Sequence, residues 1–392
     1  MTVPSSSNDS NISEYRRSFG VINPKFISER RDTVQGIWSA LEMSGVILVR
    51  GTPCSGKTTL GYLVAKYTRD ALKEPYQTVY ISQWRRKSDE HADDILRNAC
   101  TMKSSIDEIF QSRILFVIDE AQTTYSDSEL WNTHLKASSG GKTVAKFLLL
   151  ACHGSSSKWK EEVRTVTPMI AGPEQQIFLR ASSSPGYLPL SIYYKPDELD
   201  DAVRKYERER NAHYRLTPAA RKSLLDVSYG HAGLVDSLLD VVYNALEPSF
   251  REESTTEITA EAFEQYISDT QRLLWKLRSR VVGRSLVGSQ DDQPFPTELR
   301  DLVKRILETG PVIYDSMDNN HAFLYHNGIC QGHIERVRYV QSKPHVIIEA
   351  VEMTSDSVAA VTARVVGQDA FGESIWEADR TVLVFPTGIH AR

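Results

Sequence analysis

Short, continuous runs of apolar residues alternate with helical stretches between residues 44 and 180. The runs lie at 46–49, 78–81, 114–118, 147–152 and 176–179. Continuous rather than alternating hydrophobicity indicates strands that are buried on both faces, which is typical of a parallel sheet with helices on each side. The pattern predicts an α/β domain with a parallel five-stranded sheet over residues 26–195, preceded by a polar, disordered tail at 1–25.

The pattern becomes helical after Pro196. A stretch with helical period and paired charges is followed by a helix with Thr217 as its N-cap, Pro218 at its first position and Gly230 beyond its end. A third helix is expected from about Leu234 through Leu246, closed by Pro248. Together they predict a helical lid at residues 196–250.

Residues 251–392 combine helical stretches with later apolar runs. Helix is expected at 257–282, a loop rich in Gly, Ser, Asp and Pro follows, and strands are expected at 345–352, 358–366 and 381–385. A helix followed by strands predicts a winged-helix-like α+β module at the C-terminal end.

A phosphate-binding motif lies between the first predicted strand and the helix that starts near Lys57. Residues 51–58 match G-x-x-x-x-G-K-[ST], and the strand and helix around them supply the context that the motif requires. Glycine lets backbone N–H groups approach phosphates, and the helix N-terminus adds partial positive charge. We expect nucleotide contacts from Gly51, Thr52, Pro53, Cys54, Ser55, Gly56, Lys57, Thr58 and Thr59. Lys57 would reach the β- and γ-phosphates and Thr58 would ligate Mg²⁺.

An acidic pair follows the third predicted strand. Asp119 and Glu120 come directly after the apolar run 114–118, at the carboxyl edge where parallel sheets bind their ligands. This is a Walker B pattern, in which Asp119 would hold Mg²⁺ and Glu120 would orient the attacking water. Lys57 and Glu120 are therefore the candidate catalytic residues, and Thr58 and Asp119 the candidate metal ligands.

The fourth run, 147–152, is expected between the first and third strands, as in additional-strand P-loop ATPases. His153 or Ser155 at its tip could then bond to the γ-phosphate or to the water, although a loop histidine without a ligand remains an open alternative. The guanine-reading motifs N-K-x-D and T-K-x-D do not occur in the sequence. Adenine, and so ATP with Mg²⁺, is the predicted cofactor.

Charge and composition argue against nucleic acid and membranes as general binding partners. Lys and Arg number 46 against 51 Asp and Glu, a net charge of −5, which does not indicate a general nucleic-acid surface, and the basic run 85–87 reads better as a solvated loop. The longest apolar run has six residues, whereas a membrane-spanning helix needs about 20. The N-terminus lacks the pattern of a signal peptide, and four scattered cysteines suit reduced thiols. We therefore expect a cytoplasmic or nuclear protein that does not enter a membrane.

One further cluster could hold a metal. His321, His326, Cys330 and His333 offer four zinc ligands. Their spacing matches no zinc motif, and Asn327-Gly328 favours a hairpin turn within a polar loop.

Four segments together resemble the ATPase domain of fungal Crinkler-type proteins, related to the retrotransposon hot spot family and the AAA/STAND branch. They are RGTPCSGKTTL, FVIDEAQTTYSDSELWN, LLLACHGS and GHAGLVDSLLDVV, and the terminal VFPTGIH is similar as well. The resemblance implies a P-loop ATPase with a lid turn at residues 230–233, where this chain lacks the family's proline and an evident sensor arginine. Arg164 and Arg180 lie in the stretch where an arginine finger would fall, but most arginines are solvated surface residues, so the sequence does not choose between them. Some members carry a restriction-type nuclease, but the run 347–352 lacks the E-x-K pair that such a site needs.

These features leave three functional hypotheses. The first is a Mg²⁺-dependent ATPase of the AAA/STAND type that acts as a nucleotide-driven switch and self-associates on binding ATP. The second is an ATP-binding effector or scaffold with negligible turnover. The third is a helicase-like ATPase that remodels nucleic acid, suggested by Asp119-Glu120-Ala121-Gln122.

Overall fold

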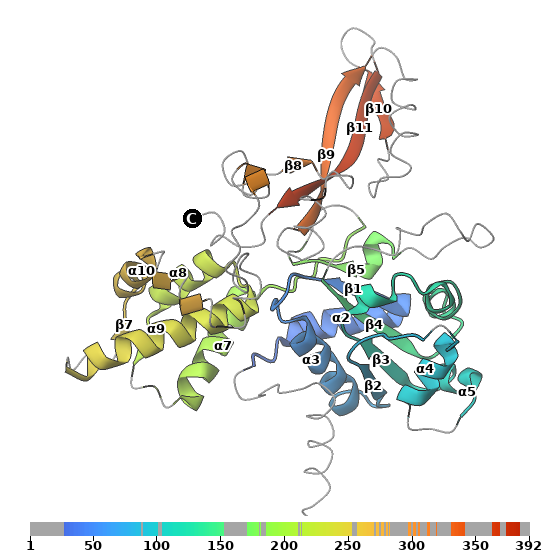
Figure 1. Cartoon of the computed structure of the whole chain (residues 1–392), viewed down its shortest axis with the longest axis horizontal. Coiled ribbons are helices and arrows are strands. Elements are labelled where there is room, and N and C mark those ends of the chain that lie inside the picture. The colour runs from blue at the N-terminus through green and yellow to red at the C-terminus, as the bar shows by residue number, and fades with distance from the viewer. Residues whose placement is uncertain are drawn as a thin grey trace, which may run out of the picture. The chain divides into compact units, whose positions relative to one another are not determined.

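The computed structural model describes residues 27–87, 89–100, 104–152, 171–179, 186–210, 214–252 and 257–269, with short pieces between and after them and four strands near the C-terminal end. Its contacts divide the chain into two units, Met1–Gly283 and Arg284–Arg392, which are described separately (Figure 1). The predicted tail at 1–25 lies outside the described residues. No helix in the described ranges has both the length and the apolar character needed to cross a bilayer.

A parallel five-stranded sheet forms the centre of the first unit, and it confirms the predicted fold class. Its strands are β1 (Val46–Arg50), β2 (Gln77–Ile81), β3 (Ile114–Ile118), β4 (Lys146–Ala151) and β5 (Gln176–Ile177). They are ordered β2-β3-β4-β1-β5, so β4 lies between the first and third strands as expected. Every residue of β3 is buried, which explains its uninterrupted apolar run.

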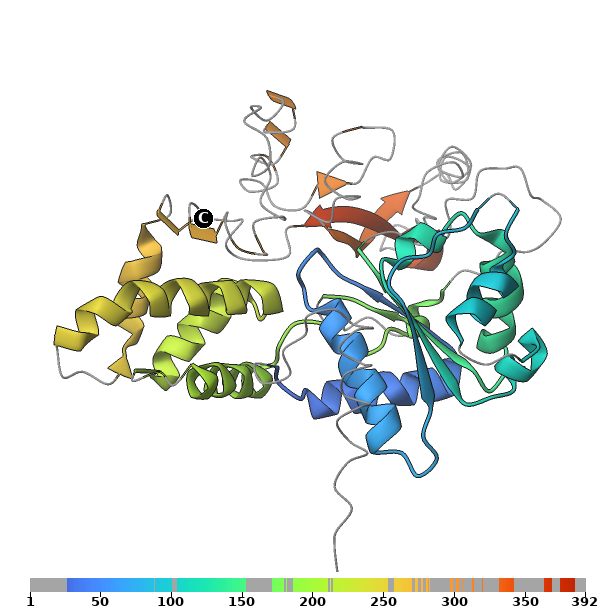
Figure 2. The same ribbon diagram turned by 60° about the horizontal axis from the view of Figure 1, so that its bottom comes forward.

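Helices cover both faces of this sheet (Figure 2). On one face, α2 (Arg31–Ser44) and α3 (Lys57–Asp70) pack residues such as Leu41 and Val64 against the sheet. On the other face, α4 (Ala92–Ala99), α5 (Ile106–Phe110) and the π-helix η3 (Leu130–Leu135) contribute Leu96 and Trp131 to a second core. A short α6 (Lys136–Ser139) follows η3.

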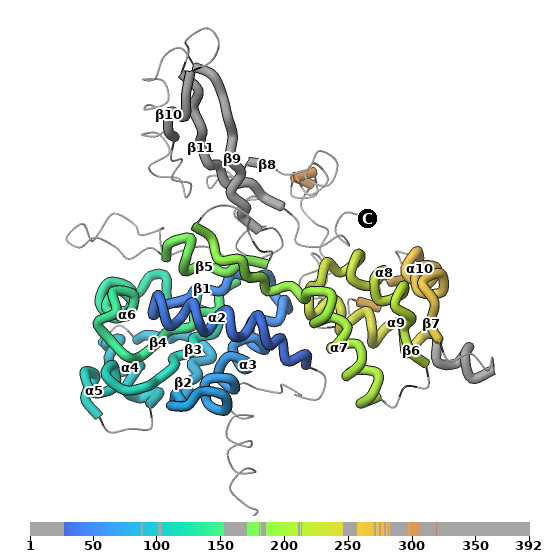
Figure 3. The backbone as a smooth tube through the Cα atoms, turned by 180° about the vertical axis from the view of Figure 1, so that it is seen from behind, coloured from blue at the N-terminus to red at the C-terminus, as the bar shows by residue number. Residues whose placement is uncertain are grey.

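The lid helices lie together beside the sheet domain (Figure 3). They are α7 (Pro196–Glu209), α8 (Pro218–Ser228), α9 (Ala232–Glu252) and α10 (Ala260–Ser268), with a short parallel pair of β6 (Arg215–Leu216) and β7 (Glu257–Ile258). Thr217 caps α8 as predicted, since its side chain accepts a hydrogen bond from the Ala220 N–H. The boundary at residue 250 stays a prediction, while α10 packs against α8.

The predicted end of the third lid helix at Pro248 is wrong, because α9 continues to Glu252. Proline removes one backbone donor and disfavours helix, but it need not end one. The helix also begins at Ala232, two residues before the predicted start.

The second unit is described mainly by an antiparallel sheet. Its strands are β8 (Val312–Ile313), β9 (Gln331–Gln341), β10 (Ala363–Gln368) and β11 (Ser374–Val384). The long strand β11 pairs with β9 along its whole length and also with β10 and β8. The strand expected at 345–352 lies outside the described residues. The winged-helix comparison for this module stays a prediction.

Candidate functional site

The phosphate-binding loop connects β1 to α3, where the motif placed it. The Gly51 N–H donates to the Ala151 carbonyl at 3.0 Å, which holds the start of the loop beside β4. Cys54 and Gly56 have φ angles of 61° and 93°, so the backbone turns through the left-handed region at both positions. A Cβ on Gly51 would lie 2.5 Å from Ser55 Oγ and 2.8 Å from Ile192 Cδ1, so a larger residue there would displace these side chains.

Lys57 points back into this loop. Its Nζ donates to the Gly51 and Thr52 carbonyls at 2.7 and 2.8 Å, and the residue is buried. The buried Ser55 Oγ has no hydrogen-bond partner among the described residues. A buried cation and an unsatisfied hydroxyl inside a glycine-containing loop suit an anionic oxygen ligand.

Asp119 joins the loop helix to the acidic edge of the sheet. Thr58 Oγ1 donates to Asp119 Oδ2 at 2.7 Å, although 61 residues separate the two in sequence. The Tyr80 hydroxyl on β2 donates to the same oxygen at 2.9 Å. Burial and then the Asp119 carboxylate raise the pKa of Tyr80, which keeps the phenol protonated and able to donate.

The exposed Glu120 contacts side chains at the carboxyl end of β4. Gln122 Nε2 donates to Glu120 Oε2 at 2.5 Å, and Cys152 Sγ lies 3.6 Å from the same oxygen. The Cys152 N–H donates to Gln122 Oε1 at 3.1 Å, so three residues form a linked group. Burial raises the pKa of the Cys152 thiol, Lys57 opposes this shift and Glu120 adds to it.

The predicted sensor His153 and the alternative Ser155 lie outside the described residues. Within the described part of the chain, the residue at the tip of β4 that reaches Glu120 is therefore Cys152.

The first turn of lid helix α9 contacts the loop through two hydrogen bonds. The Gly233 N–H donates to the Cys54 carbonyl at 3.0 Å, and Thr52 Oγ1 lies 3.1 Å from His231 Nε2. Because His231 Nδ1 accepts from the Leu234 N–H at 3.2 Å, Nε2 carries the proton of the neutral ring and donates to Thr52. A Cβ on Gly233 would lie 2.4 Å from the Cys54 carbonyl oxygen, so only glycine permits this approach.

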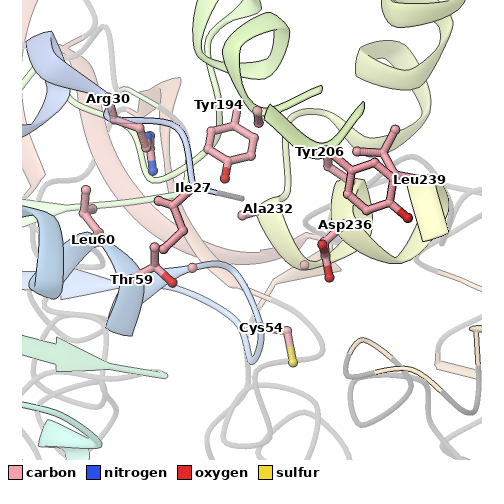
Figure 4. A pocket seen from close by; sticks show the side chains of 14 residues that line it. Ile27, Arg30, Cys54, Thr59, Leu60, Tyr194, Tyr206, Ala232, Asp236 and Leu239 are labelled. Carbon is pink, nitrogen blue, oxygen red and sulfur yellow. The ribbon is translucent and has the colours of Figure 1, made fainter. Parts of the chain in front are cut away.

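A cavity of about 210 Å³ opens between the loop and the lid (Figure 4). Its lining is mostly apolar and aromatic, with Leu60, Tyr194, Tyr206 and Leu239 around it. Asp236 adds a carboxyl whose pKa is raised by burial and by the nearby Asp240. A mostly apolar recess with few polar groups is the kind of site that holds a planar organic ring.

Arg30 forms one wall of the same cavity and is fixed in place. Its Nε donates to Glu198 Oε2 at 3.0 Å, and its Nη2 donates to the Tyr193 carbonyl at 3.1 Å. The guanidinium also lies 5.1 Å from the centre of the Tyr194 ring. The segment before α2 is thereby attached to α7 of the lid.

The sequence motifs thus indicate the loop and the acidic pair, but not all of their partners. Tyr80, Gln122, Cys152 and Arg30 were not selected from the sequence. Tyr80 becomes a candidate once β2 is known to pair with β3, since the register sets Tyr80 beside Val117. His231 lies in the turn that the sequence did single out.

No protein-family model and no curated protein matches this sequence. Solved structures that align with this chain include the Thermotoga maritima RuvB Holliday junction branch migration motor, at 16% identity and a TM-score of 0.34, covering 75% of this chain and 81% of that one. The Walker-type ATPase PABY2304 of Pyrococcus abyssi aligns at 11% identity and a TM-score of 0.43, covering 95% and 98%. Hsp104 in its closed state with ATPγS aligns at 11% identity and a TM-score of 0.37, covering 76% and 47%.

The fold itself is defined by this chain's own geometry. A parallel sheet in the order β2-β3-β4-β1-β5 carries a G-x-x-x-x-G-K-T loop after β1 and an Asp-Glu pair after β3. The first unit therefore has the α/β fold of a P-loop NTPase.

Proposed function

We propose that this protein is a Mg²⁺-dependent ATPase of the AAA/STAND type in which the bound nucleotide controls how the lid contacts the phosphate-binding loop. The observation that carries the proposal is the 2.7 Å hydrogen bond between Thr58 and Asp119, directly beside the buried Lys57. A hydroxyl and a carboxylate in contact next to a P-loop lysine are the protein groups that hold Mg²⁺ in P-loop NTPases.

The described residues fit the two groups that this function requires. The Ser55 hydroxyl and Lys57 offer donors to phosphate oxygens within the loop, and Thr58 and Asp119 offer oxygens to a magnesium ion. Magnesium would neutralise charge on the transferred phosphate. The apolar cavity beside Gly56 and Thr59 would take the adenine ring.

Glu120 is the proposed water-orienting residue. Its carboxylate lies at the acidic edge, one residue after the proposed magnesium ligand, and its backbone is in the left-handed region with φ of 48°. Gln122 and Cys152 fix the position of Oε2. The other carboxylate oxygen would accept a hydrogen bond from the water.

The lid would respond to the nucleotide through His231. Thr52 belongs to the loop and His231 caps the N-terminus of α9, so a change in the loop is passed to the first turn of that helix. Lys57 donates to the Thr52 carbonyl in the present arrangement. If Lys57 turned toward phosphates it would release this carbonyl, which gives the loop two arrangements that the lid can distinguish.

The finer assignment to Crinkler-type proteins, and self-association on ATP binding, are part of this proposal. The first is supported by the sequence segments that resemble that family, and the second by the resemblance to the AAA/STAND branch. Dynamic light scattering of the full chain with and without ATP tests the second, and an unchanged hydrodynamic radius would contradict it.

A second candidate function is ATP binding with negligible turnover, as in a nucleotide-gated scaffold. It is favoured by the contacts of Glu120, because the Gln122 amide donates to Oε2 and Cys152 Sγ lies against the same oxygen, which leaves one carboxylate oxygen for the water. No observation on the described residues favours the helicase-like alternative, since they contain one parallel five-stranded sheet of this type.

The Glu120→Gln variant separates these functions. We expect it to bind ATP with unchanged affinity and to lose at least about 100-fold in turnover, because a neutral amide cannot accept the proton of the water. Phosphate release and fluorescent-nucleotide binding measure the two effects, with Glu42→Gln on the exposed side of α2 as a control for charge removal elsewhere. Turnover equal to that of the wild type would exclude the assigned role, and no turnover in the wild type would favour the scaffold.

A further inference from the structure

A group of metal-ligating side chains lies between α4 and η3, and none of them belongs to the phosphate-binding loop or to the acidic pair. Asp93 on α4, Glu129 just before η3 and His134 within η3 each offer one ligand atom, and these atoms lie within 4.8 Å of one another. Asp93 and Glu129 are half-buried and His134 is buried. Two carboxylates and an imidazole from segments 36 residues apart therefore converge on one point.

The π-helical geometry of η3 explains why Glu129 and His134 share a side. In an α-helix of 3.6 residues per turn, residues five positions apart point about 140° away from each other. The segment Leu130–Leu135 instead has i to i+5 hydrogen bonding, which brings such residues close to one face. Single π-helical turns are rare and are frequently found at functional sites.

His134 gives an independent indication of a ligand. The residue is 6% exposed, and its ring stacks on Phe110 with a centroid separation of 4.9 Å. Nε2 lies 2.8 Å from Asp93 Oδ1, but this contact lacks hydrogen-bond geometry, and Nε2 has no hydrogen-bond partner in the part of the chain that is described. A buried ring nitrogen that contacts a carboxylate without a well-formed hydrogen bond is unfavourable unless a further group, such as a cation between the two, satisfies it.

The surroundings orient the second carboxylate. Arg86 Nη2 lies 2.9 Å from Glu129 Oε2, and the Ala92 N–H donates to the same oxygen at 3.1 Å. These contacts hold Glu129 Oε2 in place, in the way that groups hydrogen-bonded to metal ligands orient those ligands. Glu129 Oε1 lies 3.3 Å from His91 Nδ1, which adds a second imidazole at the solvent-exposed rim.

We propose that Asp93, Glu129 and His134 form a binding site for a Zn²⁺ ion that ties α4 to η3. An imidazole nitrogen with carboxylate oxygens is a ligand set that suits zinc, whereas magnesium and calcium prefer oxygen ligands alone. Ligand atoms within 4.8 Å need only side-chain adjustment to converge at zinc bonding distances of about 2.0–2.2 Å. The site is separate from the proposed magnesium site at Thr58 and Asp119, and its ligand set does not depend on the proposed ATPase function.

The test is a Co²⁺ titration of the full chain, stripped with a chelator and kept in excess Mg²⁺ to fill oxygen-only sites. Co²⁺ is a spectroscopic substitute for Zn²⁺, and competition with Zn²⁺ then gives the zinc affinity. We expect one equivalent with visible ligand-field bands and no thiolate charge-transfer band. Asp93→Asn should weaken zinc binding by more than about tenfold, since even outer partners of metal ligands contribute about 10- to 100-fold.

Three variants make the result specific. Asp94→Asn removes the same charge from the neighbouring residue of α4, where Asp94 pairs with Arg97, and should leave zinc binding unchanged. Cys330→Ser disrupts the alternative cluster predicted at residues 321–333 and should also leave it unchanged. His134→Asn removes the buried ligand and is assayed for folding by circular dichroism, while the half-exposed Asp93 keeps the test valid if that variant fails to fold. Equal zinc affinity in Asp93→Asn and Asp94→Asn, loss of binding in Cys330→Ser, or no binding by the wild type would overturn the proposal.

Discussion

Apolar packing fills the interior of both the sheet and the lid of the first unit, whereas the junction between the lid and the phosphate-binding loop is made by hydrogen bonds. In the sheet, every residue of β3 is buried, and Phe116 stacks on Phe147 with a centroid separation of 4.9 Å. In the lid, the buried Glu207 accepts hydrogen bonds from the Leu216 N–H and the Tyr243 hydroxyl, at 2.9 and 2.8 Å. The lid reaches the phosphate-binding loop through hydrogen bonds of His231 and Gly233.

This difference indicates that the sheet core stays fixed while the junction between the lid and the loop can rearrange. Burial of one large apolar side chain contributes about 1.5–3 kcal/mol, whereas one hydrogen bond contributes about 1 kcal/mol net. Two hydrogen bonds between lid and loop can therefore be exchanged at small cost. Micromolar binding of a nucleotide would supply about 8 kcal/mol, and the part of that energy that differs between two lid arrangements would shift the lid while the sheet stays intact.

The largest effect, on the free energy of unfolding, is expected from Phe116→Ala in the core of the sheet. Phe116 is fully buried, so its truncation should destabilise the first unit by about 3–5 kcal/mol through lost burial and a cavity. Urea unfolding followed by circular dichroism measures this change. Met43→Ala on α2 is the matched control, because Met43 is 79% exposed and its loss should have little effect. A loss below about 1 kcal/mol for Phe116→Ala would contradict the tight packing of the sheet core.

Lys57→Ala changes the phosphate-binding loop, which lies between the sheet and the lid. Removing the buried ammonium should weaken ATP binding by about 100-fold, because charge-assisted contacts to phosphates are lost. The free energy of unfolding should change less than in Phe116→Ala, since only hydrogen bonds to the Gly51 and Thr52 carbonyls are removed. Fluorescent-nucleotide titration measures the affinity, and Lys66→Ala is the control, because Lys66 is a half-exposed lysine of the same helix paired with Asp70. Unchanged affinity in Lys57→Ala would contradict the assigned site.

Gly233→Ala changes only the contact between lid helix α9 and the loop. It should have the smallest effect of the three variants. Alanine favours helix over glycine by about 1 kcal/mol, but its Cβ would lie 2.4 Å from the Cys54 carbonyl and push α9 from the loop. We expect ATP affinity to fall by about tenfold, the cost of roughly one lost hydrogen bond, with the sheet's stability unchanged. Gly140→Ala is the control, since its φ is −80° and its Cβ would meet nothing closer than 3.4 Å. Equal affinities in the two variants would mean that the lid contact is not coupled to the nucleotide.

Local patterns predicted the elements well where one physical signal dominated. The run 114–118 coincides with β3 because a strand buried on both faces needs apolar residues at every position. Thr217 was recognisable as an N-cap because its side chain satisfies a backbone N–H within the same short segment. Pro248 misled the prediction of where α9 ends, because propensity within a helix yields to its packing elsewhere.

The sequence by itself determined the buried strands of the parallel sheet, the phosphate-binding loop and the acidic pair. Each of these depends on residues adjacent in the chain or on one pattern of apolar residues. Only the tertiary structure decided that Tyr80 supports Asp119, that Gln122 and Cys152 hold Glu120, and that His231 bonds to Thr52. The tertiary structure also placed Asp93 beside His134, and this contact depends on a π-helical turn that the pattern of apolar residues does not predict. These contacts join residues up to 179 positions apart, and strand register and helix geometry, rather than local composition, set the distances between such residues.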